Sequence, residues 1–244
     1  MNSTAAATGS LVQRAIQAVT QHIRSHGLRV GDSLPGEKHF ATALGVSHAV
    51  MREAFQALAA LRLIDVGNGR RPRVAALDAS VIATSMDHAI STAQITVPEI
   101  WDVRRTIELR TVELAASSRT DAEALEILRL AEEIAAHADD RAAVTSHDIA
   151  FHEAIALASR NALFIQIVRA FGPLMEVAVP RAWQTRRTKA QRTEIVRRHR
   201  AIARAIFDRD PAAATAAMDT HFDSSIGVVL AQAATEVVGR PASS

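Results

Sequence analysis

The chain of 244 residues has no cysteine, and it contains only 10 glycines and 7 prolines. The absence of cysteine excludes disulfide bonds and thiolate metal sites. Any metal site must therefore use nitrogen and oxygen ligands. Few glycines and prolines, together with abundant Ala, Leu, Ile and Arg, are typical of a helical protein.

Long apolar runs are also lacking. No stretch approaches the roughly 18 uninterrupted apolar residues of a membrane-spanning helix. The first ten residues, MNSTAAATGS, contain no basic segment followed by an apolar one, which excludes a secretory signal in this segment. We therefore expect a soluble, cytoplasmic protein with no membrane partner.

Charge is distributed unevenly although the net charge is only +2. Residues 1–76 carry nine Lys or Arg against four Asp or Glu, whereas the remaining residues carry 19 against 22. A basic N-terminal third beside a mildly acidic remainder is typical of a DNA-contacting module joined to one that does not touch DNA. Chance clustering of charge is the alternative.

The segment 34–54, LPGEKHFATALGVSHAVMREA, predicts two short helices joined at Gly45, with Ser47 as the N-cap of the second. Residues just after that cap project from the first turns, as in the recognition helix of a helix-turn-helix. A helix at 11–25 precedes the pair. Extended segments at 63–66 and 73–75 flank Gly67-Asn68-Gly69, a hairpin turn signal. The sequence therefore predicts a winged helix-turn-helix domain over residues 11–76, with a basic wing.

A linker with one short helix is expected over 77–96, and an all-α domain over 97–238, for which the family resemblance given below implies effector binding and dimerisation. Thr96 and Pro98 begin its first helix, and Thr120 with Glu123 forms a capping box for the second. Further helices are predicted at 141–159, 162–171, 189–208 and from Pro211 onward. The predicted fold class is mainly α, a winged helix-turn-helix domain followed by a helical bundle.

Three apolar helix stripes of the second domain contain titratable side chains. Asp148 and His152 lie four residues apart on one face of a helix, while His199 and His221 lie on the stripes of two others. Buried titratable groups need partners, so these four side chains should meet one another or a cation. One carboxylate and three imidazoles suit Zn²⁺, Ni²⁺ or a similar ion. Ordinary hydrogen-bonded core histidines and a simple Asp–His pair remain open as alternatives.

Both halves of the chain resemble one family. The helix-turn-helix segment and its wing are similar to the GntR family of bacterial transcription regulators. Residues 98–228 resemble the ligand-sensing FCD domain of its FadR subfamily. The residues that carry this second resemblance are Arg104 and Glu108 in WDVRRTIE, Asp148 and His152 in HDIAFHEAI, Asn161, His199 in RRHRAIARAI and His221 in MDTHF.

The resemblance implies a DNA-binding surface. Its candidate residues are Lys38, Ser47, His48, Arg52, Gly69 and Arg70. Lys38 and His48 occupy positions where the family usually has arginine, and Gly36 a position where it usually has serine. Arginine can bind phosphate or guanine through two parallel hydrogen bonds, whereas lysine offers a point charge. The operator sequence is therefore expected to differ from the common one of the family.

The resemblance also implies a function. The quartet Asp148, His152, His199 and His221 is expected to bind a divalent ion, Zn²⁺ first, and Arg104 to bind a small organic or sugar acid as effector. The expected protein is a homodimeric regulator and not an enzyme. It is expected to be a repressor, because release of DNA on effector binding is the commoner behaviour in the family. A metal-dependent hydrolase, an architectural DNA-binding dimer, and a structural metal with the effector bound elsewhere are the alternatives.

Overall fold

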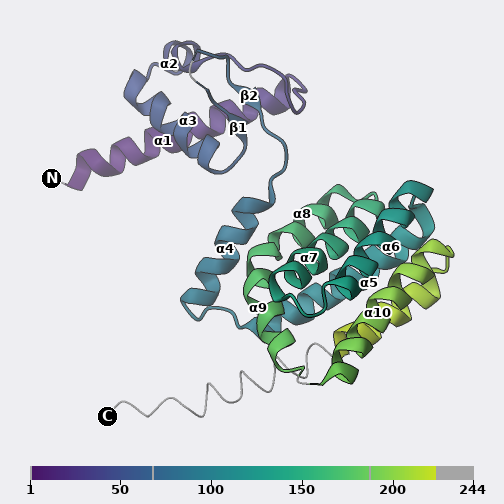
Figure 1. Cartoon of the computed structure of the whole chain (residues 1–244). Coiled ribbons are helices and arrows are strands. Elements are labelled where there is room, and N and C mark those ends of the chain that lie inside the picture. The colour runs from purple at the N-terminus through teal and green to yellow at the C-terminus, as the bar shows by residue number, and fades with distance from the viewer. Residues whose placement is uncertain (1, 68, 187, 224–244) are drawn as a thin grey trace, which may run out of the picture. The chain divides into compact units, whose positions relative to one another are not determined.

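The computed structural model describes residues 2–67, 69–186 and 188–223. By its internal contacts the chain forms two compact units, which divide between Val81 and Ile82. Both units consist mainly of helices (Figure 1), so the predicted fold class is confirmed. The division falls inside the segment that was predicted as a linker, where helix α4 (Ala79–Ser91) lies.

The first unit contains three helices and a short hairpin. These are α1 (Asn2–Ser25), α2 (Glu37–Leu44), α3 (His48–Ala60), β1 (Ile64–Asp65) and β2 (Arg73–Val74). Helix α1 begins before the predicted start at Leu11, and the alanines at 5–7, which are strong helix formers, favour that extension. A core of apolar side chains joins the three helices to β1, with Val19, Phe40, Met51, Phe55, Leu58 and Ile64 buried.

The turn between α2 and α3 follows from two residues. Gly45 has a φ of +65° at the C-cap of α2, a left-handed conformation that glycine adopts without a steric penalty. The side chain of Ser47 accepts a hydrogen bond from the Val50 N–H at 3.3 Å and so caps α3. Gly45 and Ser47, from which the helix-turn-helix was predicted, therefore form its turn in the structure.

The wing is a two-stranded antiparallel hairpin with Ile64 opposite Val74 and Asp65 opposite Arg73. Both strands are shorter than predicted. Strand β2 also pairs on its other side with the segment that precedes α2, because Gly31 N–H donates to Val74 O (2.9 Å) and Val74 N–H donates to Asp32 O (3.0 Å). The base of the wing is thus held by hydrogen bonds on both edges of β2.

The second unit is an all-helical bundle. Its helices are α5 (Val97–Ser118), α6 (Asp121–Ala136), α7 (Arg141–Ala158), α8 (Ala162–Ala170), α9 (Gly172–Gln184), α10 (Lys189–Phe207) and a helical segment at 211–223. Thr120 with Glu123 forms the predicted capping box at the start of α6, and Thr96, the predicted cap of α5, forms a second capping box with Glu99. The part of the last predicted helix beyond residue 223 lies outside the described residues.

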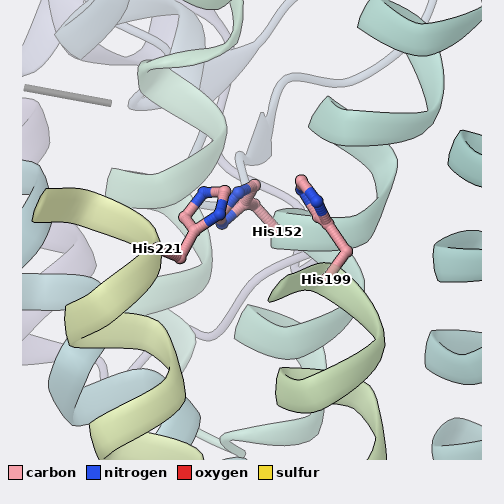
Figure 2. A group of neighbouring side chains, drawn as sticks. All are labelled: His152, His199 and His221. Carbon is pink, nitrogen blue, oxygen red and sulfur yellow. The ribbon is translucent and has the colours of Figure 1, made fainter. Parts of the chain in front are cut away.

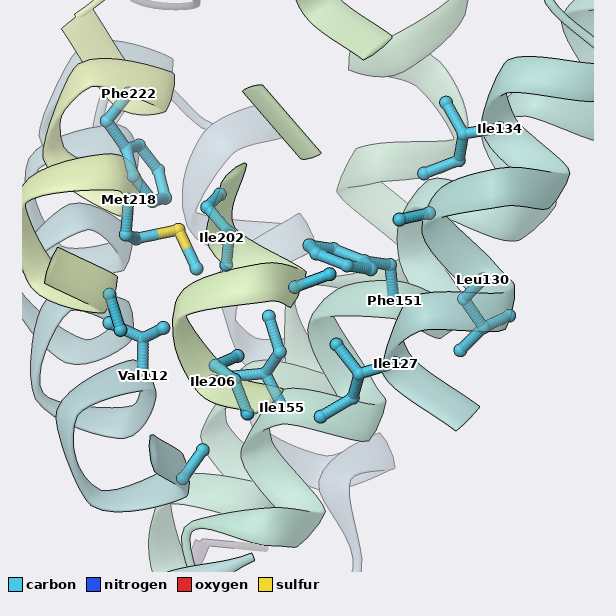
Figure 3. Packing of buried hydrophobic residues seen from close by; sticks show 14 of the residues in the cluster. Val112, Ile127, Leu130, Ile134, Phe151, Ile155, Ile202, Ile206, Met218 and Phe222 are labelled. Carbon is cyan, nitrogen blue, oxygen red and sulfur yellow. The ribbon is translucent and has the colours of Figure 1, made fainter. Parts of the chain in front are cut away.

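Helix α7 occupies the middle of this bundle, because it packs against α5, α6, α8 and α9. Figure 3 shows its side chains Phe151 and Ile155 surrounded by apolar residues of the neighbouring helices. The polar side chains of α7 that face these helices, Asp148 and His152, are buried and must find partners inside the bundle.

Helix α9 was not predicted. Pro173 lies in its first turn and Pro180 in its interior, and prolines usually signal the end of a helix. Its apolar side chains Met175, Val179 and Trp183 are buried in the bundle. Tertiary packing has therefore outweighed the local signal.

No single helix in the described part of the chain is long and apolar enough to cross a membrane. Within that part, only the bent pair α8–α9, taken together, has the length and apolar composition of a span.

Candidate metal centre

Three helical segments bring four titratable side chains together inside the second unit. Helix α7 contributes Asp148 and His152, one turn apart, while α10 contributes His199 and the segment 211–223 contributes His221. All four are buried, with exposed fractions of 9% or less. The structure therefore brings together the four residues that the sequence predicted to meet.

The three imidazoles gather in one space between their helices (Figure 2). The ring centroids of His199 and His221 are 4.7 Å apart, those of His152 and His221 are 5.3 Å apart, and those of His152 and His199 are 6.3 Å apart. One ligand nitrogen from each histidine lies within 4.8 Å of the others. These separations place three nitrogen donors around a common point.

Asp148 adds an oxygen donor. Its Oδ1 lies 3.1 Å from Nε2 of His199. Two ligands at about 2.1 Å from one ion lie about 3.0–3.4 Å apart, so this pair has the separation of neighbouring ligands. Burial raises the pKa of Asp148, but the hydrogen bond with His199 and the charges of His152, His199 and Arg104 outweigh burial and lower it. Asp148 is therefore a carboxylate at neutral pH.

The hydrogen bonds of two histidines leave Nε2 directed at the cluster. His199 Nδ1 lies 2.9 Å from the carbonyl oxygen of Ile195 and donates to it, so Nε2, which faces Asp148, is the nitrogen that an ion would bind in place of a proton. His152 Nδ1 is hydrogen-bonded to Glu108, and its Nε2 is buried with no hydrogen-bond partner among the described residues. A buried imidazole nitrogen without a partner is costly, and binding of an ion would remove that cost.

Burial also keeps His221 neutral. Desolvation, followed by the charges of His199 and His152, lowers the pKa of His221 well below 6.5. Metal ions bind the neutral form of imidazole. The residues present therefore fit a divalent ion by their donor set, by their spacing and by the unpaired nitrogen of His152.

Arg104 and Glu108 of α5 form a buried pair beside this cluster. Their exposed fractions are 4% and 1%, and Glu108 accepts from Arg104 Nε with one carboxylate oxygen and contacts His152 Nδ1 with the other. The Arg104 guanidinium also contacts Met175 Sδ and lies 5.1 Å from the Trp101 ring centroid. Arg104 is thus an interior residue, not part of a pair on the helix surface.

Glu108 was named in the sequence only as part of a motif and as a pairing partner for Arg104. Burial raises the pKa of Glu108, but Arg104 and His152 outweigh burial and lower it, so it is ionised. Its i, i+4 spacing from Arg104 was visible in the sequence, but the contact with α7 was not. The structure therefore adds Glu108, whose carboxylate contacts both His152, a candidate metal ligand, and Arg104, the candidate effector-binding residue.

Arg186 was missed entirely. It follows α9, its guanidinium lies 5.4 Å from the Trp183 ring centroid, and its charge interacts with Asp148. Desolvation lowers the pKa of Arg186, and it forms no ion pair with any residue that the structure describes. Nothing in the spacing of the sequence links this residue to the cluster.

The candidate DNA-binding residues lie in the first unit and are exposed. Lys38 lies in the first turn of α2, His48 and Arg52 lie in the first turns of α3, and Gly69 and Arg70 lie in the wing. Gly69 has a φ of +70°, which glycine permits. Ser47 is exposed and caps α3 through its hydroxyl.

Comparison with known proteins agrees with both units. Residues 11–74 match the bacterial regulatory proteins of the gntR family, and residues 99–224 match the FCD domain. The chain belongs to the GntR family. It is a DNA-binding transcription regulator with an FCD ligand-sensing domain, and not an enzyme.

Similar curated proteins are transcription regulators. The Glc operon transcriptional activator of Escherichia coli K12 is 30% identical over 200 residues, which cover 80% of this chain and 79% of that protein. The transcriptional repressor NanR of Salmonella newport is 29% identical, over 85% of this chain and 81% of that protein. LutR of Bacillus subtilis is 27% identical, over 82% and 92%. These relatives include an activator and a repressor.

A solved GntR structure from Streptococcus agalactiae has the same fold. It superimposes with a TM-score of 0.64 at 22% sequence identity, over 88% of this chain and 99% of that one.

Proposed function

We propose that this regulator binds a divalent metal ion, zinc first and nickel or a similar ion otherwise, between Asp148, His152, His199 and His221. The observation that carries the proposal is the buried Nε2 of His152, which has no hydrogen-bond partner among the described residues and lies beside the imidazoles of His199 and His221. Asp148 adds a carboxylate next to His199. A bound ion would supply positive charge and free coordination positions for an anionic ligand.

The effector in this proposal is a small organic or sugar acid. Asp148 contributes one negative charge to the cluster, and the Arg104–Glu108 pair is neutral as a whole. A dication among neutral histidines therefore leaves the site with a charge of about +1, which favours a carboxylate. Glu108 engages Nε of Arg104 and Met175 contacts Nη1, so the effector would meet Nη2. Arg186 is a second cation nearby.

Control of transcription would follow from coupling between the FCD domain and the DNA-binding unit. In a homodimer, two recognition helices α3 must meet half-sites about one helical turn apart. An effector that prefers one arrangement of the dimer changes operator affinity by its difference in affinity for the two arrangements. For the direction of regulation, we propose that effector binding releases the protein from its operator, as in a repressor.

Thermal unfolding with a panel of hydroxy acids, dicarboxylates and sugar acids tests this function. An acid that raises the Tm of metal-loaded protein, and fails to do so after chelation, identifies the effector class and places it at the ion. Bound metal with no shift for any acid would contradict the sensor and make the ion structural. Turnover of any of these acids by the purified protein would instead support the alternative of a metal-dependent hydrolase.

Substitution of Glu108 by glutamine is expected to weaken metal binding by about 10–100-fold, because partners that orient a metal-binding histidine have effects of this size. Glutamine keeps the shape of the side chain but leaves the buried Arg104 without its counter-charge, so the free energy of unfolding should fall, and circular dichroism would verify that the variant is folded. Equilibrium dialysis of zinc measures the affinity. An unchanged affinity would show that Glu108 does not orient His152.

Alanine at Arg52 is expected to lower operator affinity by about 5–150-fold, since a bidentate arginine contact to a base contributes about 1–3 kcal/mol. Fluorescence anisotropy on duplexes selected from a random pool would measure this change. The metal affinity should stay as in the wild type, because Arg52 lies in the other unit. Arg24→Ala on α1 is the matched control, and an equal loss there would indicate a general effect of charge.

A further inference from the structure

A second group of candidate metal ligands lies outside the core site, between α6 and α7. Glu133 belongs to the last turn of α6, His137 is its C-cap, and His147 belongs to α7. One ligand atom from each lies within 4.8 Å of the others, and all three side chains are at least partly exposed. We call these three residues the α6–α7 cluster.

The orientation of His137 suits a metal ligand. Its Nδ1 lies 3.0 Å from the carbonyl oxygen of Glu133, four residues earlier, so Nδ1 donates and Nε2 keeps its lone pair. His199 of the core site is held by its own helix in the same way, through the carbonyl of Ile195. A backbone acceptor on the second nitrogen is a usual support for a metal-binding histidine.

Glu133 and His147 complete the set. One ligand atom of each lies within 4.8 Å of one of His137, and the ring centroids of His137 and His147 are 5.3 Å apart. Arg129 holds Oε1 of Glu133 at 3.2 Å, while Oε2 lies 3.4 Å from His137 Nδ1 and would turn from that N–H to the ion. Two imidazoles and one carboxylate, with room for water, match the ligands of zinc and of similar divalent ions.

We propose that the α6–α7 cluster is a second site for a divalent transition-metal ion. It is separate from the core site, although His147 precedes Asp148, because adjacent residues of a helix point about 100° apart. The ion joins the end of α6 to α7 across the connection at 137–140. It therefore stabilises the helix pair that carries Asp148 and His152.

A simpler role for His137 is that of a cation at the C-terminus of α6, where positive charge interacts favourably with the helix dipole. That role involves neither His147 nor a metal. The two explanations therefore predict different results for replacement of His147. It should abolish binding of the second ion if the metal site exists, and it should change nothing if His137 acts only as a cation at the helix end.

The experiment is equilibrium dialysis of zinc against the chelator-treated full chain, with the number of bound ions as readout. The wild type should bind two ions per chain, and His137→Ala/His147→Ala should bind one. His152→Ala/His221→Ala, which removes two core ligands, should retain the ion of the α6–α7 cluster. Exposed His88 on α4, changed to alanine, is the matched control and should leave two ions.

Glu133→Gln gives a milder test that leaves both histidines in place. It should weaken the second ion at least about tenfold, because even indirect partners of metal ligands have effects of that size. One bound ion in the wild type, lost only with the core variant, overturns the proposal. Two ions that persist in His137→Ala/His147→Ala also overturn it. Neither result bears on the core site, so the proposed function is judged separately.

Discussion

Alanine at His199 is expected to weaken zinc binding at the core site by more than about 100-fold. Loss of an orienting partner alone has an effect of about 10–100-fold, and His199 is itself a proposed ligand that also contacts Asp148. Isothermal titration of chelator-treated protein measures the affinity. Because an ion at 100 times its Kd stabilises a protein by about 2.7 kcal/mol, the variant should also lose the rise in Tm that zinc gives the wild type.

His88→Ala serves as control for this variant, because His88 is an exposed histidine of α4. It should bind zinc at the core site as the wild type does. If His199→Ala bound zinc with the affinity and the stoichiometry of the wild type, the ion would lie elsewhere and the four side chains would be an ordinary hydrogen-bonded cluster. The proposed metal dependence of the sensor would then be wrong.

Alanine at Arg104 is expected to have the second large effect, in two parts. The response of operator binding to the effector should disappear, since the effector loses its guanidinium partner. The free energy of unfolding should fall by about 3–5 kcal/mol, because removal of one partner leaves a buried charge on Glu108. Urea unfolding measures the second part and fluorescence anisotropy on operator DNA measures the first.

The double variant Arg104→Ala/Glu108→Gln separates the two parts. Glutamine removes the uncompensated charge, so much of the lost stability should return, while the effector response should remain absent. Operator binding without effector should be retained in both variants. A response that survives in the double variant would show that Arg104 is a structural residue and that the effector binds elsewhere.

The sequence predicted most helices because their ends are marked by local chemistry. Thr96 and Thr120 cap the helices that they were expected to cap, and Gly45 with Ser47 defines the turn between α2 and α3. Helix α9 escaped prediction because its prolines are breaking signals, whereas its place in the structure depends on buried contacts from other helices.

The candidate site could be predicted in part for a similar reason. The i, i+4 spacing puts Asp148 and His152 on one face of α7, and burial explains why polar side chains on apolar stripes meet. Which helices face α7 depends on the packing of the bundle. The contact of Glu108 with His152 and the place of Arg186 near Asp148 therefore became visible only in three dimensions.

The most direct test of the core metal site is an anomalous difference map from crystals of the zinc-loaded protein, recorded at the zinc absorption edge. The account predicts a peak about 2.0–2.2 Å from an imidazole nitrogen of His152, His199 and His221 and from a carboxylate oxygen of Asp148. A map without a peak between these four side chains, from protein shown to contain zinc, would contradict it.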